Sequence, residues 1–114
     1  MPVTIYHNPR CSKSRQTLEL IRDAGFQPQI IEYMNSPPSV DTLRDLLTKL
    51  GLGAADLVRR NEAAFREMGL SSASEETLLE AMSREPKLIQ RPIVVRGRQA
   101  RLGRPPEDVL EILE

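Results

Sequence analysis

The sequence predicts an α/β fold in which a β-α-β unit and a β-β-α unit build a mixed four-stranded sheet. Near the N-terminus, an apolar alternating run precedes a helical pattern and then a second β-branched run. Two strands joined by a helix of this length run parallel, with a right-handed crossover. Near the C-terminus, two short apolar runs flank a turn that contains glycine, which is the pattern of a β-hairpin. The stretch between these two units shows only helical patterns.

The elements of the first unit follow from residue types and spacing. Val3–Tyr6 alternates as a strand does, and Ser12–Ala24 places Thr17, Leu18, Ile21 and Ala24 on one helical face. Gly25 is expected to end this helix as its C′ residue, because glycine adopts the left-handed conformation without steric cost. Gln29–Tyr33 is β-branched and aromatic enough for the second strand.

The middle of the chain is predicted to be helical. Pro37-Pro38 interrupts the chain, and Ser39 is a typical N-cap for a helix that runs up to Gly51. The apolar stripe of that helix consists of Leu43, Leu46, Leu47 and Leu50. Residues 54 to 70 hold two short helical pieces, whose candidates for burial are Leu57, Val58, Phe65 and Met68. Another helix is expected from Ser74 to about Arg84.

The C-terminal part is predicted to contain the hairpin and a last helix. The two strands are Ile93–Val95 and Ala100–Leu102, with the turn at Gly97. The last helix is expected to open at residues 103–106. Its apolar residues are Val109, Leu110, Ile112 and Leu113.

Composition restricts the classes of function. The 114 residues are expected to form one domain, and sixteen basic and sixteen acidic side chains cancel. This balance indicates neither a nucleic-acid partner nor a membrane surface. The sequence shows no signal peptide and no apolar run near the length of a membrane span. One cysteine and one histidine cannot form an internal disulfide or, by themselves, a metal site, so no metal is expected and a cytoplasmic location is the simplest interpretation.

The single cysteine, Cys11, lies where the first strand passes into the first helix. Free N–H groups and the positive end of the helix dipole point at this position. Together with Arg10, Lys13 and Arg15, they are expected to lower the pKa of the thiol and to offer a pocket for an oxyanion. A lone cysteine is more often a small buried apolar residue. The polar neighbours of this one favour a reactive thiolate.

The residues at fixed spacings from Cys11 restrict the kinds of thiol chemistry that this cysteine can perform. Cys11 and Ser14 form Cys-x-x-Ser, which has the spacing of a dithiol redox site with its second sulfur replaced by a hydroxyl. This hydroxyl can donate a hydrogen bond to a thiolate but cannot resolve a disulfide, so a second thiol must come from outside. A cysteine phosphatase would need an arginine six residues after the cysteine, where this chain has Thr17.

Other residues are weaker candidates on their own. His7 could support the thiolate electrostatically or through a hydrogen bond, or it could be a polar residue at the rim of the sheet. Arg59, Arg60, Arg91 and Arg104 are cations whose planar guanidinium groups suit a tetrahedral oxyanion, although a surface arginine is the commoner case. Arg91 and Arg104 each precede a proline at an element boundary, and Pro92 is a possible cis-proline.

With these motifs, the chain resembles the glutaredoxin-linked, glutathione-dependent arsenate reductase family from end to end. The resemblance rests on separated blocks in the same order and spacing. These blocks are Ile5-Tyr6-His7-Asn8-Pro9, Ser14-Arg15, Thr17-Leu18-Glu19, Arg59 followed by Asn61, Arg91-Pro92-Ile93-Val94-Val95, Arg101-Leu102 and Arg104-Pro105. The branch that carries Cys-Ser-Lys-Ser-Arg and Gly-Arg-Pro-Pro-Glu is the most similar. These two motifs stand here at 11–15 and 103–107.

The resemblance implies a thioredoxin-like fold with a helical insertion at about residues 36 to 88. It makes Cys11 the nucleophile that forms a thiolate–arsenate adduct, and it matches His7 and Ser14 with residues that favour the thiolate. Arg59, Arg91 and Arg104 match the arginines that bind the oxyanion, whereas Arg60 matches a variable position. No bound cofactor is implied. Glutathione would be the co-substrate that attacks the adduct, and glutaredoxin the partner that reduces the resulting mixed disulfide.

Two other functions stay open at this point. The chain could be a glutathione-dependent reductase or deglutathionylating enzyme with another substrate. This possibility is kept because Ser12-Lys13 stands where better-known arsenate reductases carry Gly-Thr. It could also be a non-enzymatic redox sensor, similar to the transcription regulators that bind RNA polymerase. Those sensors commonly carry Cys-x-x-Cys, so Ser14 argues against a self-contained disulfide switch.

Overall fold

The structure is a computed structural model that describes residues 2–113. Its elements are β1 (Val3–His7), α1 (Ser12–Asp23), β2 (Gln29–Glu32), α2 (Val40–Leu50), α3 (Ala54–Leu57), α4 (Ala63–Glu67), η1 (Leu70–Ser72), α5 (Glu75–Arg84), η2 (Pro86–Leu88), β3 (Ile93–Arg96), β4 (Gln99–Leu102) and η3 (Pro106–Ile112). The chain divides into two compact units. The first consists of the residues up to Ser36 and from Arg91 onward, and the second is Pro37–Gln90.

The first unit is built on one mixed sheet with the strand order β2-β1-β3-β4. β1 and β2 are parallel, so His7 and Glu32 lie opposite each other where the two strands end. β3 is antiparallel to β1, and β3 and β4 form the hairpin. The predicted α/β class and the mixed four-stranded sheet are confirmed.

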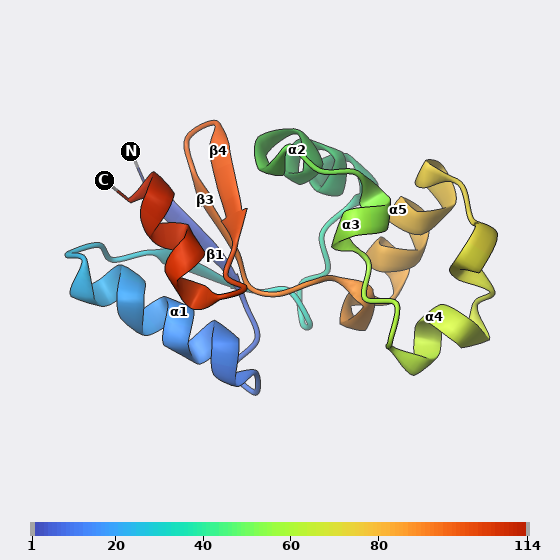
Figure 1. Ribbon diagram of the computed structural model, residues 1–114, viewed down its shortest axis with the longest axis horizontal. Helices are drawn as coiled ribbons and strands as arrows, with labels where there is room; N and C mark the ends of the chain where they lie inside the picture. Colours follow the sequence, from blue (N-terminus) through green and yellow to red (C-terminus); the bar gives the residue numbers. More distant parts are fainter. Residues whose placement is uncertain (1, 114) are drawn as a thin grey trace. The chain divides into compact units, whose positions relative to one another are not determined.

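One face of the sheet carries the hydrophobic core of the first unit. α1 and η3 lie side by side over this face (Figure 1). The core joins the inward-facing residues of β1 and β3 to the apolar sides of both helices: Val3, Ile5, Leu18, Ile21, Val94, Val109, Ile112 and Leu113. The core lies on one face of β1. The carboxyl end of β1 leads into the loop before α1, where a site can form.

The end of α1 follows the predicted glycine signal. Gly25 has a φ of 94°, and its N–H donates to the carbonyl of Arg22 at 2.9 Å. The N–H of Phe26 donates to the carbonyl of Ile21 at 3.2 Å. This pair of hydrogen bonds is a Schellman motif, which satisfies carbonyls that the helix leaves open.

The second unit is helical between its two ends. Ser39 caps α2 by accepting a hydrogen bond from the N–H of Thr42 at 3.1 Å, and Gly51 ends α2 with a φ of 71°. Three of the four predicted stripe leucines are buried, while Leu50 is partly exposed. Met68 is 38% exposed, so its predicted burial is wrong: it follows the last residue of the short helix α4 instead of lying on that helix's apolar side.

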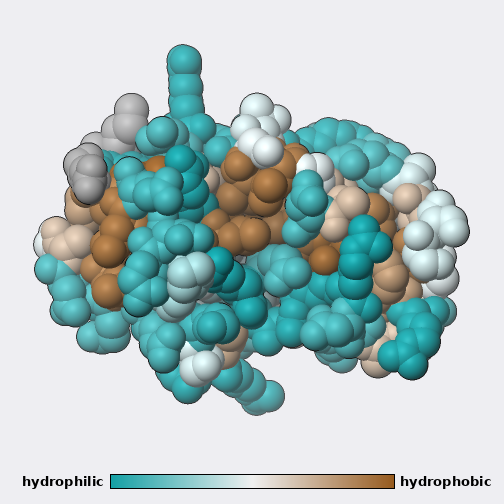
Figure 2. All heavy atoms as spheres, in the orientation of Figure 1, coloured by the Kyte–Doolittle hydropathy of each residue, from teal (hydrophilic) through white to brown (hydrophobic). Residues whose placement is uncertain are grey.

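The last helix of the first unit is a 3₁₀-helix that begins at Pro106, and Leu110 on it is 38% exposed. On the face where α1 and η3 lie, Figure 2 shows hydrophobic surface (brown) between hydrophilic areas.

Across residues 2–113, no helix combines the length and the apolar character that a membrane crossing requires.

Gly103 packs closely against Pro92 and Thr17. Its N–H donates to the carbonyl of Pro92 at 2.9 Å. A Cβ at this position would lie 2.5 Å from Thr17 Oγ1 and 2.7 Å from Pro92 Cγ. We expect Gly103→Ala to lower the free energy of unfolding by about 1–3 kcal/mol, because neither neighbour can move away cheaply. Chemical denaturation monitored by circular dichroism measures this effect.

Gly53→Ala is the matched control for this glycine. A Cβ at Gly53 would meet its nearest neighbours at 3.7 and 3.8 Å, which is ordinary van der Waals contact. The expected loss of stability is under about 1 kcal/mol, from replacing glycine at an N-cap. Equal stability of the two variants would contradict the packing argument for Gly103.

Candidate active site

Cys11 is the N-cap residue of α1. Its backbone is extended, with φ −96° and ψ 123°, and the cap has no side-chain hydrogen bond. The Cys11 N–H donates to the carbonyl of Asn8 at 3.0 Å, and its own carbonyl accepts the N–H of Arg15 at 3.0 Å. The loop therefore closes on itself before the helix starts. The first amides of the helix are left to point at the thiol.

These amides and one arginine lower the pKa of the thiol. Partial burial of Cys11 by itself would raise the pKa of the thiol. The backbone N–H of Ser14, the guanidinium of Arg91 and the backbone N–H of Lys13 all favour the thiolate electrostatically, and together they outweigh burial. The pKa of Cys11 is therefore lowered from its ordinary value, and the thiolate is the nucleophilic form.

The source of this effect differs in part from the expectation. Arg15 does not face the thiol as a charge partner: its Nη1 donates to the carbonyl of Pro9 at 2.8 Å and holds the loop before Cys11. Lys13 acts on the sulfur through its backbone N–H, and the cation that lowers the pKa is Arg91. Side chains that are neighbours in sequence point away around the first helical turn, whereas Arg91 reaches the sulfur from the start of β3.

His7 and Ser14 form a buried pair behind the loop. His7 Nδ1 and Ser14 Oγ are 2.7 Å apart, and the N–H of Asn8 donates to the same hydroxyl oxygen at 3.0 Å. Burial lowers the pKa of His7. Glu32 opposes this shift, while Arg22 and Arg15 add to it. Ser14 thus favours the Cys11 thiolate through its backbone N–H, and its hydroxyl connects the neutral His7 to the loop that carries the thiol.

Arg104 contacts the backbone of Arg91, the arginine that acts on Cys11. Arg104 Nε donates to the backbone carbonyl of Arg91 at 2.8 Å, so the second arginine fixes the segment that carries the first. Arg91 Nε is buried and, within residues 2–113, has no hydrogen-bond partner. A buried donor without a partner is costly unless a ligand satisfies it. Both arginines precede a proline in a cis peptide bond, which includes the Pro92 that the sequence suggested.

Arg59 belongs to the second unit. Its Nη1 donates to Glu62 Oε2 at 3.1 Å, and its backbone N–H donates to the carbonyl of Leu88 at 2.7 Å. These contacts anchor Arg59 where α3 ends, at the bridge between Val58 and Ile89. Five of the six predicted site residues thus lie in the first unit, and Arg59 lies in the second.

The sequence did not indicate the residues that shape the site through backbone contacts and do not act electrostatically on the thiol. Asn8 closes the loop with its carbonyl and holds Ser14 with its N–H. Gly103 allows the segment of Arg104 to approach Pro92 and α1. The only sequence signal for them is their position beside Cys11 and Arg104, since backbone contacts leave little trace in residue type.

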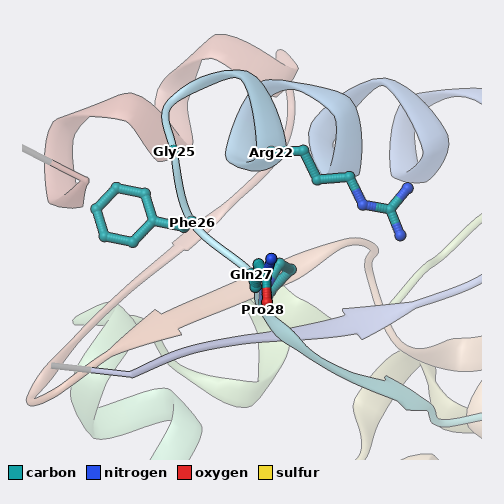
Figure 3. A pocket seen from close by; sticks show the side chains of 5 residues that line it. All are labelled: Arg22, Gly25, Phe26, Gln27 and Pro28. Carbon is teal, nitrogen blue, oxygen red and sulfur yellow. The ribbon is translucent and has the colours of Figure 1, made fainter.

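A separate hollow of about 550 Å³ lies at the other end of α1, lined by Arg22, Gly25, Phe26, Gln27 and Pro28. Figure 3 shows that the side chains of Arg22 and Phe26 point apart. The guanidinium of Arg96 lies 4.9 Å from the centre of the Phe26 ring, and that ring packs against the core. These residues have a structural role at a distance from Cys11.

The sequence was compared with protein families and with known proteins, and it is similar to the following. The model of the ArsC family matches residues 6–112. The chain is 53% identical to the uncharacterized protein YfgD of Escherichia coli (strain K12), over 97% of this chain and 96% of that protein. It is 47% identical to an arsenate reductase of Rhizobium meliloti (strain 1021), over 99% of this chain and 82% of that protein.

A solved structure confirms the fold. The arsenate reductase from Vibrio cholerae superposes with a TM-score of 0.95 at 50% identity, and the match covers 98% of both chains. The α/β architecture described above is therefore the thioredoxin-like fold of these proteins, as the sequence resemblance implied.

Proposed function

This chain belongs to the ArsC family, and we propose that it reduces arsenate to arsenite at Cys11. The observation that carries the proposal is the set of donors on the thiol. Two backbone N–H groups and the Arg91 guanidinium lower the pKa of one thiol, and Arg91 Nε has no partner among the described residues. Such a group stabilises a thiolate and leaves hydrogen bonds for an oxyanion bound beside it. Arsenate reductases at 47% and 45% identity support arsenate as that oxyanion.

In the first step, the Cys11 thiolate attacks the arsenic atom of hydrogen arsenate. An S–As bond forms and one As–O bond breaks. The departing hydroxide takes up the proton that the thiol lost on ionising and leaves as water. Arg91 and the first amides of α1 are placed to hold the oxygens that stay on arsenic, where their positive potential stabilises the negative charge of the adduct.

In the second step, the sulfur of glutathione attacks the adduct. A disulfide forms between glutathione and Cys11, the S–As bond breaks, and its electron pair stays on arsenic, which is thereby reduced from As(V) to As(III). The thiol proton of glutathione passes to the arsenite that leaves. Because Cys11 is the only cysteine, no internal thiol can resolve this disulfide. A glutaredoxin thiolate then attacks the glutathione sulfur of this mixed disulfide. A disulfide between glutaredoxin and glutathione forms, and the Cys11 thiol is released.

The other residues have supporting roles in this proposal. Arg104 fixes the backbone of Arg91 and adds positive charge, and the His7–Ser14 pair keeps the loop of Cys11 in place. The role of Arg59 as the third oxyanion arginine rests on its position in the family motif. The side chain of Lys13 is exposed, and its backbone N–H is one of the groups that lower the pKa of Cys11.

Coupled NADPH oxidation tests this function. The assay contains the protein, arsenate, glutathione, glutaredoxin and glutathione reductase, and each component is omitted in turn. We expect oxidation that requires arsenate, glutathione and this protein together. Oxidation without arsenate would indicate a glutathione-dependent enzyme with another substrate. No oxidation with any arsenate concentration, while Cys11 reacts readily with glutathione disulfide, would contradict the assignment of arsenate.

A further inference from the structure

A second hollow, of about 460 Å³, lies beside the loop of Cys11. Two chain segments of the first unit line it. One is the loop between β1 and α1, directly before Cys11, and the other is the end of β2 with the turn after it. The lining residues are Asn8, Pro9, Arg10, Glu32, Met34 and Asn35.

The position of this hollow follows from the sheet. β1 and β2 are parallel neighbours, and their last residues, His7 and Glu32, are partners in register. Crevices at the carboxyl ends of parallel strands are the usual ligand sites of α/β sheets. Here the crevice borders on the loop Asn8–Arg10, whose carbonyl at Asn8 accepts the N–H of Cys11. A ligand in it would therefore lie next to the residue that carries the thiol.

Two side chains of opposite charge, Arg10 and Glu32, line the hollow, and neither forms an ion pair among residues 2–113. The Arg10 guanidinium makes no hydrogen bond or ion pair with any of residues 2–113, and only its backbone N–H is engaged, with Asn8 Oδ1 at 3.0 Å. The Glu32 carboxylate accepts a single long hydrogen bond from Asn35 Nδ2, at 3.4 Å. Arg10 and Glu32 do not pair with each other. Met34 also lines the hollow, is 37% exposed and offers an adaptable apolar contact.

We propose that this hollow binds the incoming thiol co-substrate, and that its charges select a zwitterionic peptide thiol such as glutathione. This inference rests on the proposed function. Arg10 holds a carboxylate of the peptide and Glu32 holds its ammonium group, while Met34 contacts the methylene groups. The central thiol is then presented to Cys11 from the side of the loop. The chemical step is unchanged: the sulfur of the peptide forms the disulfide with Cys11, and the bond that Cys11 held before is broken.

The test uses this exchange without arsenate. The full-length protein is converted by Ellman's reagent into the mixed disulfide between Cys11 and thionitrobenzoate, and an added thiol releases thionitrobenzoate, which is coloured. Glutathione is compared with 2-mercaptoethanol, a neutral thiol of small size, at equal thiolate concentration. We expect Arg10→Gln to lower the rate constant for glutathione about fivefold, the effect of losing one exposed charge contact. The rate constant for 2-mercaptoethanol should stay unchanged.

Two variants sharpen the result. Arg98→Gln removes an exposed cation at the turn of the hairpin and should change neither rate constant. Arg10→Glu should slow glutathione further and favour cysteamine, whose ammonium group it would attract. An equal loss with glutathione and 2-mercaptoethanol would show that Arg10 acts on the Cys11 sulfur itself, and would overturn the proposal. Because arsenate is absent, a failure here is distinct from a failure of arsenate reduction.

Discussion

Replacing Cys11 by serine should reduce arsenate-dependent NADPH oxidation to the rate without the protein. A serine hydroxyl is not ionised near neutral pH, so the donors that stabilise the thiolate would have no anion to stabilise. Serine also cannot form the mixed disulfide with glutathione that the reduction requires. Because the chain has one cysteine, no other thiol can take over this role. The coupled assay with equal amounts of both proteins measures the effect.

The fold should tolerate this change, which makes the comparison clean. Cys11 is partly exposed at the N-cap of α1, and serine is among the preferred residues at that position. Circular dichroism and the denaturation midpoint of Cys11→Ser should therefore match those of the wild type or exceed them slightly. Arsenate-dependent turnover by a folded Cys11→Ser protein would refute Cys11 as the nucleophile.

Replacing Arg91 by alanine is expected to lower kcat/KM for arsenate about 10²- to 10³-fold, the usual effect of removing one donor from an oxyanion site. The change removes the cation on the sulfur and the buried Nε that an oxyanion would satisfy. It should also raise the pKa of Cys11, since the thiolate loses a charged partner while its partial burial stays. Fewer molecules then carry the thiolate near neutral pH, and the rate of alkylation by iodoacetamide falls there.

Two further variants separate the roles of Arg91. Arg91→Lys keeps the positive charge but not the planar fork, so it should restore much of the alkylation rate and less of kcat/KM. Arg98→Ala, at the exposed turn of the hairpin, should change neither quantity. If Arg91→Ala kept the wild-type pH dependence of alkylation, the assignment of Arg91 as the charge partner of Cys11 would be wrong.

Local signals in the sequence were sufficient for most of the fold. Gly25 and Gly51 end α1 and α2 as predicted, because a left-handed residue after a helix is a requirement of the backbone that glycine meets. Ser39 and Ser74 cap the helices that follow them. The hairpin appears around Gly97, where the turn needs a positive φ. Such features depend on neighbours in sequence, which a pattern can reveal.

Features that depend on distant residues were predicted less well. The contact between Arg91 and Cys11 joins the start of β3 to the start of α1, and only the family resemblance pointed to it. The sequence indicated Arg15 as a charge partner of the thiol, but the structure gives it the carbonyl of Pro9. The exposure of Met68 likewise depends on how a short helix faces its neighbours. An apolar residue by itself does not define such a face.

The central claim is that Cys11 receives arsenate and then glutathione, and intact-mass spectrometry tests it most directly. The protein is incubated with arsenate and glutathione in the absence of glutaredoxin, so that the mixed disulfide cannot be reduced. We expect one glutathione per chain, attached at Cys11 only when arsenate is present, with arsenite released in equal amount. No glutathione on Cys11, or the same amount with and without arsenate, would contradict it.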